Sequence, residues 1–445
     1  MTEPPPPSAP TQEVLPQNTL PREWARLHAL SPLLRSLRAL VFLVPVVALN
    51  RRGRTNFQTN VDIAVVILVL IAGVVSWLVT RWRIHSGELQ IETGLIRRQS
   101  IRVPLTRMQA VDIVRPLLAR MFGLAEVRIV VAGQGTGRTR LAYLTDSRAE
   151  SVRAQLLAIA HGLAPDVPTP AEQPLLHVPG GRIVGANLVS GLTVILCAYV
   201  FVAIFVAATV STKGGGAAIG SAIPVVLGLV LGLARRIGAE WEFTVAEAGD
   251  GLRLRAGLLQ TRAETIPFGR IQALRVVTPL WWRPFGWVRV EIDVARRHDR
   301  DRSEQEGSAV TRALLPVGSA GEAQWIVSRV FPTAPMTRPA GARAPRRAWW
   351  RAPLQQHNLD AWHDDDFVLC AEGRLVRRVT IIPLAKAQSI RWSQGPVLRR
   401  LRLAHVHVDT AGRRFPGAAL CRDEQQAREW IRSLPDLART ARSRR

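Results

Sequence analysis

One motif occurs three times in this chain, so the fold must be built from units that share one architecture. Each copy places a glycine, a proline and a glutamine at the same spacing. These are Gly94, Pro104 and Gln109 in the first copy, Gly257, Pro267 and Gln272 in the second, and Gly373, Pro383 and Gln388 in the third. The repeat therefore predicts three similar structural modules in a chain of 445 residues.

Each copy is typical of short strands that end in a helix. A strand such as "ELQIETG" leads to the glycine, where the chain turns into a second strand. The proline in that strand indicates a strand end or a bulge, because proline cannot occupy the regular interior of a central strand. We expect the glutamine amide to tie the loop after the proline to neighbouring backbone. Amphipathic helices from Asp146, Ala320 and Arg422 close the three copies. The pattern predicts small β-barrels or sandwiches, each with a helix at its open end.

The core I-P-x-x-(R/K)-x-Q, followed in two copies by Phe122–Gly123 and Phe285–Gly286, resembles the bacterial pleckstrin-homology-like (PH-like) domain. More narrowly, it is similar to the membrane proteins of the bacterial PH domain 2 type, a family formerly catalogued as a domain of unknown function. The resemblance implies a partly open seven-strand barrel with a C-terminal helix and no enzymatic activity. The third copy has Leu401–Arg402 in place of the Phe-Gly pair, so the resemblance leaves the geometry of its turn open.

Apolar runs lie between the copies. Val61–Thr80 and Ile183–Val210 reach the roughly 20 residues that a helix needs to cross a bilayer. With Ala217–Ala234 and a weaker run near Ser31–Leu49, they predict two α-helical hairpins. The predicted fold class is a membrane protein in which α-helical transmembrane hairpins carry three β-rich PH-like domains.

These observations predict a division of the chain into nine parts. They are a disordered Pro-rich N-terminus (1–30), transmembrane hairpin 1 (31–80), PH-like domain 1 (81–165), a linker (166–182), transmembrane hairpin 2 (183–234), PH-like domain 2 (235–335), a linker (336–349), PH-like domain 3 (350–437) and a basic tail (438–445).

The net charge of +25 comes almost entirely from arginine, because Lys213 and Lys386 are the lysines of the chain. Four spans would leave all three domains on one side of the membrane, and the positive-inside rule makes that arginine-rich side cytoplasmic. We therefore expect a multi-pass protein of the cell (cytoplasmic) membrane whose globular domains are cytoplasmic. Its expected partners are the membrane, anionic phospholipid or an unknown protein. Nucleic acid is not expected, because no recognition motif accompanies the charge.

Two basic clusters are the candidate contacts with anionic lipid or a protein partner. Near an anionic leaflet each such charge contributes about 1 kcal/mol, whereas the alternative is a solvated arginine face. The residues are Arg97, Arg98, Arg102 and Arg107 in the first copy, and Arg374, Arg377, Arg378 and Lys386 in the third.

Three other patterns invite a chemical interpretation. His405, His407 and Asp409 alternate along one strand face, and two histidines with a carboxylate can bind zinc. The other copies carry unlike polar residues there, which favours a solvated face. "WHDDDF" (362–367) lacks the spacing of a cation loop and indicates an acidic turn, and "AGQGTG" from Ala132 lacks the Lys-Ser/Thr of a phosphate loop and indicates a hairpin. No metal, cofactor or catalytic residue is predicted.

The function that these expectations favour is a non-enzymatic integral membrane scaffold that presents three PH-like domains at the cytoplasmic leaflet and binds a protein partner or anionic lipid. The alternative is a sensor of envelope stress or antimicrobials, or a transport-associated protein, in which the spans carry the function. Transport is disfavoured because no predicted span carries an ionisable residue near its middle.

Overall fold

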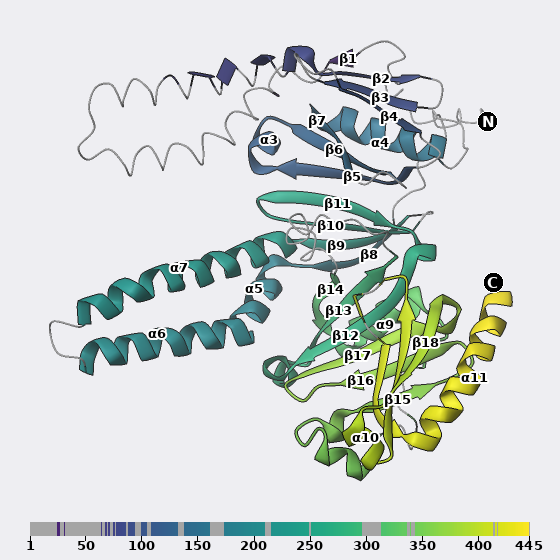
Figure 1. Ribbon diagram of the computed structural model, residues 1–445. Coiled ribbons are helices and arrows are strands. Elements are labelled where there is room, and N and C mark those ends of the chain that lie inside the picture. The colour runs from purple at the N-terminus through teal and green to yellow at the C-terminus, as the bar shows by residue number, and fades with distance from the viewer. Residues whose placement is uncertain are drawn as a thin grey trace, which may run out of the picture. The chain divides into compact units, whose positions relative to one another are not determined.

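The computed structural model, drawn in Figure 1, divides into two compact units, residues 1–169 and 170–445, and each is described by itself. The residues that it describes are 25–26, 31, 64, 67–68, 70–71, 74–75, 77–85, 88–93, 99–104, 108–131, 138–160, 173–209, 215–248, 251–295, 313–335, 339, 343–412, 414–415 and 417–444. Gly94, Arg97, Arg98 and Arg107 lie outside the described residues, as does the glycine loop 132–137.

The first unit holds the first repeat copy in two antiparallel sheets and two helices. Its elements are β1 (Ala25–Arg26), β2 (Arg81–His85), β3 (Glu88–Thr93), β4 (Gln99–Pro104), β5 (Met108–Pro116), α3 (Leu117–Met121), β6 (Leu124–Val131), β7 (Arg138–Thr145) and α4 (Asp146–Ala160). Strands β1 to β4 form one sheet in sequence order, and β5, β6 and β7 pair in turn. Trp82, Leu89 and Ile113 from the strands meet Val152 and Leu156 of α4 in one apolar cluster, so the amphipathic helix closes the module as its sequence predicts.

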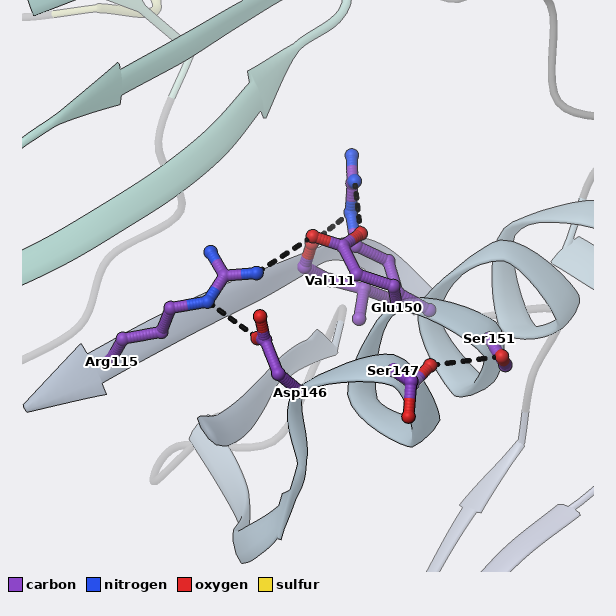
Figure 2. Close-up of polar contacts among 7 residues, drawn as sticks. Val111, Arg115, Asp146, Ser147, Glu150 and Ser151 are labelled. Carbon is purple, nitrogen blue, oxygen red and sulfur yellow. Dashed lines mark hydrogen bonds and ion pairs between the residues drawn. The ribbon is translucent and has the colours of Figure 1, made fainter. Parts of the chain in front are cut away.

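Ion pairs fix α4 to its sheet. The guanidinium of Arg115 on β5 donates to Asp146 Oδ1 over 2.6 Å and to Glu150 Oε1 over 3.0 Å, as Figure 2 shows. Burial opposes the charge of Arg115, but the hydrogen bonds and charges of the two carboxylates outweigh it and raise its pKa. Asp146 lies in the first turn of α4, where a carboxylate also complements the helix dipole, so its contact favours the start of the helix at this point.

The second unit holds the second copy, and helices α5 (Gly180–Leu188), α6 (Gly191–Thr209) and α7 (Gly215–Glu240) lie between its first two strands. The elements of this copy are β8 (Gln173–Val178), β9 (Phe243–Ala248), β10 (Gly251–Ala256), β11 (Gln260–Ile266), η2 (Phe268–Arg270), β12 (Ile271–Pro279), η3 (Leu280–Phe285), β13 (Trp287–Val294), β14 (Ala313–Ser319) and α9 (Ala320–Val330). Strands β8 to β11 pair in sequence order. A capping box between Ser319 and Glu322 begins α9.

The third copy also lies in the second unit. Its elements are η6 (Arg346–Trp350), η7 (Gln356–Asn358), β15 (Asp360–His363), β16 (Phe367–Glu372), β17 (Val376–Pro383), η8 (Leu384–Lys386), β18 (Ala387–Ser393), α10 (Pro396–Arg400), β19 (Leu403–Thr410), β20 (Gly417–Asp423) and α11 (Glu424–Ser443). Trp430 and Leu434 of α11 are buried in the core of this copy, and Ile431 packs partly buried beside them. The described part of the copy has six strands, β15 to β20, one fewer than the resemblance implies.

Copies two and three share a sheet. Its order is β14-β13-β12-β17-β16-β15, so the second copy contributes three strands and the third copy contributes three. The join is the antiparallel pairing of β12 with β17, from Leu274 opposite Ile381 to Pro279 opposite Val376. Ile381 and Leu369 of the third copy accordingly lie in the core cluster of the second.

The marker residues of the motif each correspond to one backbone feature. Pro104 and Pro383 are the last residues of β4 and β17, so of the two alternatives, a strand end or a bulge, the structure has the strand end at both prolines. The register shifts of β5, β12 and β18 fall between the neighbours of Gln109, Gln272 and Gln388, so each glutamine is the extra residue of a β-bulge.

The turn after the short helix is the same in all three copies. Gly123 and Gly286 have φ of 64° and 63°, and Arg402 adopts φ of 51° at the equivalent position. The turn of the third copy, which the sequence left open, therefore has the same geometry as the other two, and the fold holds an arginine in the left-handed region that glycine occupies elsewhere.

The predicted fold class was wrong in its transmembrane hairpins. In the described part of the chain, no single helix is both long and apolar enough to cross a membrane; one pair bent by 46°, Gly180–Leu188 with Thr193–Val202, meets that test of length and composition. The expected span Ile183–Val210 is interrupted because α5 ends at Leu188. Ile183 and Ala186 of α5 are buried, and Trp282 Nε1 donates to the carbonyl oxygen of Ala186 over 2.9 Å. This part of the apolar run is thus core of the second unit.

Two ranges differ in content from what the sequence indicated. The range 166–182, predicted as a linker, contains β8, which pairs with β9. The range 438–445, predicted as a basic tail, contains the last turns of α11, where Ala438 and Ala441 are buried. Apolar residues on one face of an arginine-rich segment were enough to extend the helix.

Candidate binding surface

The described basic candidate of the first copy is Arg102. It is exposed on β4, the last strand in the β1-β2-β3-β4 sheet, and lies opposite Gln90 of β3. The structure thus places one of the four predicted arginines of this copy on a solvent-facing strand.

The basic candidates of the third copy lie at the join between copies two and three. Lys386 Nζ donates to the carbonyl oxygen of Gly269 in the second copy over 2.7 Å. The guanidinium of Arg377 lies 3.7 Å from Asp360, and that of Arg378 lies 4.0 Å from Glu372. Arg374 is exposed, and its carbonyl oxygen accepts from Arg283 of the second copy. These residues therefore do not form one free basic face, since β17 is paired and several of their polar groups are bound.

Side chains reinforce this join on both sides of the β12–β17 ladder. The buried carboxylate of Asp293 on β13 accepts from the backbone N–H groups of Arg414 (3.0 Å) and Phe415 (3.2 Å) in the third copy. A Cβ on Gly412 would lie 2.3 Å from that carboxylate, so the close approach requires glycine. Arg275 on β12 donates to Thr380 and stacks 4.2 Å from the Phe415 ring. Modules in this chain thus associate through strand edges.

Strand β18 is the counterpart of β12 in the third copy, because the glutamine bulge marks the same position in both. The sheet order β18-β19-β20 leaves β18 at an edge, and no described strand pairs with its outer side. Most of its residues are exposed, and the Trp392 side chain is 38% exposed. An unpaired edge of this kind presents backbone N–H and C=O groups that another strand can bind.

Helix α11 borders this edge. The Arg428 guanidinium lies 5.4 Å from the centre of the Trp392 ring, which joins the helix to β18. An open hollow of about 440 Å³ lies along the same helix, lined by Gln425, Arg428, Glu429, Arg432 and Ser433. We call β18 together with this hollow the β18–α11 edge.

The predicted histidine pair lies on the outer face of β18 and β19. His405, His407 and Asp409 share one partly exposed face of β19, as the alternation predicted. Each already has a partner: His405 Nδ1 accepts from the Cys421 N–H over 2.8 Å, and Asp409 accepts two bonds from Arg391, at 2.6 Å and 3.0 Å. In the described part of the chain, no group of three or more potential ligands is arranged to hold a metal ion.

The electrostatics of this face keep its histidines neutral. Burial, with smaller contributions from neighbouring positive groups, lowers the pKa of His405 and of His407. The hydrogen bond from Arg391 lowers the pKa of Asp409, although burial opposes it. The face therefore carries one closed ion pair and two uncharged rings at neutral pH.

This face also holds a serine–histidine contact that no sequence pattern indicated. Ser393 Oγ lies 3.1 Å from His407 Nε2, within hydrogen-bond reach. A serine nucleophile also needs a group that orients its histidine and a pocket that excludes water. Here the nearby Asp409 bonds Arg391 and Ser389, and β18 is exposed. The contact is therefore a hydrogen bond between neighbouring strands on an exposed sheet surface, and it does not have the arrangement that a serine nucleophile needs.

The acidic stretch and the repeat glutamine of the second copy have the structural roles that the sequence indicated. In "WHDDDF", Asp364 Oδ1 accepts from the N–H groups of Asp366 and Phe367, which confirms the acidic turn before β16. The side-chain amide of Gln272 donates to the carbonyl oxygen of Arg270 over 3.3 Å and so closes the turn after Pro267. Gln388 is exposed.

The β18–α11 edge was not found from the sequence. The available signal was the repeat itself, because its alignment makes β18 the counterpart of β12, the strand that pairs with the next copy.

Comparison with known proteins gives one family. The family model described as "Bacterial PH domain" matches residues 39–160, 192–330 and 327–438, three segments that together cover most of the chain. Neither the curated proteins nor the solved structures contain a match to it.

Proposed function

The chain belongs to the bacterial PH domain family, and from that premise we propose that it is a non-enzymatic scaffold that holds a partner protein at the cytoplasmic face of the cell membrane. One observation carries the proposal: the second and third copies associate by strand pairing, β12 with β17, and no strand of the described residues pairs with the outer side of the counterpart edge, β18. A surface of the type that the chain uses for its own assembly is thus available to another protein.

Two further features support this function. The Ser393–His407 contact lies on an open sheet face, and among the residues that the structure places around it there is neither an orienting carboxylate nor an enclosed pocket, which favours binding over catalysis. The net charge of +25 favours a position beside an anionic leaflet, where basic side chains are attracted to lipid headgroups.

Site-specific photocrosslinking in cells tests the proposal. A photoreactive residue at Ser393, on the free edge, should form a discrete protein adduct that fractionates with the membrane. The matched control is Gln324, an exposed position on α9, the counterpart of α11 in the second copy. Protein adducts of equal yield at both positions, or none at Ser393, would contradict a partner-binding edge.

A further inference from the structure

We infer that an extended, acidic segment of a partner protein binds the β18–α11 edge as an added antiparallel strand. This inference rests on the proposed scaffold function and names the chemistry of its partner. It follows from the backbone geometry of β18, from the hollow along α11 and from the charges around them.

The second copy shows how such a strand would lie. Leu274 to Pro279 of β12 pair with Ile381 to Val376 of β17. The equivalent residues of the third copy, by their distance from the repeat glycines, are Ile390 to Gly395. An added strand in the same register would run antiparallel along this stretch, with Trp392 near its middle. Main-chain hydrogen bonds supply the affinity in this mode of recognition, and side-chain pockets supply the specificity.

The hollow along α11 supplies such a pocket. Gln425, Arg428, Glu429, Arg432 and Ser433 line it, and Arg428 stacks on Trp392 of the edge strand. Alternate side chains of an added strand point to the same side. Those on the side of Trp392 would therefore face the helix, with the indole and the arginines as their contacts.

The charges around the edge favour acidic side chains at those positions. Arg428 is already paired with Glu424 over 2.6 Å, and Arg391 with Asp409. Arg432 in the hollow, and Arg399 and Arg400 on the α10 helix that follows β18, are exposed and make no ion pair with a described carboxylate. Glu429 is the acidic residue in the lining of the hollow. The excess is positive, so a segment rich in Glu or Asp complements it.

The same charges disfavour a second copy of this chain as the occupant. The counterpart of β17 in the first copy is β4, which carries Arg102 and follows Arg97 and Arg98 in the sequence. Pairing β4 with β18 would bring these arginines to a surface that already has an unpaired excess of arginine. Repulsion between like charges weakens such a pairing.

Peptide binding to the full-length protein tests the inference. The probe is a fluorescent eight-residue peptide that alternates valine and glutamate, and anisotropy measures its binding. We expect saturable binding that weakens as salt rises, and at least tenfold weaker binding to Arg399→Glu/Arg432→Glu. The control Arg374→Glu, which reverses an exposed charge on the β16–β17 turn, should leave affinity unchanged. Hydrogen exchange should show new protection of the amides at 390–395.

Two altered probes separate backbone pairing from charge attraction. Methylation of alternate peptide nitrogens removes the ladder donors and should abolish binding, and a valine–lysine peptide should not bind. Equal binding of the methylated peptide would overturn strand addition, and equal binding of the lysine peptide would overturn the acidic chemistry. Phosphatidylglycerol vesicles that displace the acidic peptide and protect 390–395 themselves would reassign the edge to lipid. If no peptide binds but a photoreactive residue at Ser393 still forms a protein adduct, the acidic segment is refuted and the proposed scaffold function is retained.

Discussion

Replacing Arg402 by glycine should stabilise the third copy, and the structure sets the size of the effect. Arg402 has φ of 51°, a left-handed conformation that costs a non-glycine residue roughly 1–2 kcal/mol. Glycine removes that cost but adds backbone entropy to the unfolded chain, worth about 0.5–1 kcal/mol. The Arg402 side chain is exposed, while its carbonyl oxygen accepts from Glu424 N–H, a backbone bond that glycine keeps. The expected net gain is about 1 kcal/mol.

Hydrogen exchange of the full chain measures this gain locally. A stabilisation of about 1 kcal/mol should slow exchange of the β19 amides, which follow the turn directly, about fivefold, because RT is about 0.6 kcal/mol. The matched control is Arg400→Gly, which removes the same side chain two residues earlier but from helical backbone. There glycine should speed exchange, since it costs roughly 0.5–1 kcal/mol in a helix. If both variants change exchange in the same direction, the left-handed turn is not the source of the effect.

Two other predictions concern a turn and a titrating group. Gly373→Ala should lower the thermal unfolding midpoint, because φ is 91° and the new Cβ would lie 2.1 Å from the Val376 carbonyl oxygen. The expected strain is about 1–3 kcal/mol. The control Gly269→Ala should change the midpoint little, because no atom lies within 4 Å of the new Cβ there. His405 has a folded pKa below its unfolded value of about 6.5, so the unfolded state binds more protons and stability is lost as pH falls through 6.5 toward the folded pKa. His405→Asn keeps an acceptor for the Cys421 N–H and should flatten that part of a stability–pH curve, and an unchanged slope would assign the titration to another group.

The repeat predicted the local structure of each module well. Proline placed the strand ends, the aligned glycines placed left-handed turns, and the amphipathic pattern placed α4, α9 and α11. These features depend on the backbone preferences of residues that are close together in the chain, and such preferences can be predicted from the residue types alone. Arg402 shows the limit of that approach, since the surrounding fold imposed the turn on a residue that does not favour it.

The associations between modules could not be predicted in the same way. The pairing of β12 with β17 joins residues such as Arg275 and Thr380, 105 positions apart, and no local pattern encodes their register. The apolar run from Ile183 was misread for a related reason. Its composition suits a bilayer and a protein core equally. Trp282, which lies far along the chain, donates a hydrogen bond to Ala186, and this contact places that part of the run in the protein core. The β18–α11 edge depends on the same kind of long-range information.

The separation of β12 and β17 along the sequence also has a consequence during synthesis. A ribosome adds about 5–20 residues per second, so roughly 5–20 s pass between the emergence of Arg275 and that of Thr380. Throughout that interval the second copy has a hydrogen-bonding edge and a core face whose cover has not yet been translated. Nascent chains on neighbouring ribosomes of one messenger carry the same edge, and unpaired edges are prone to aggregate. Slower elongation across residues 276–380 should therefore lower the yield of native protein, and a chaperone that occupies β12 in that interval should restore it.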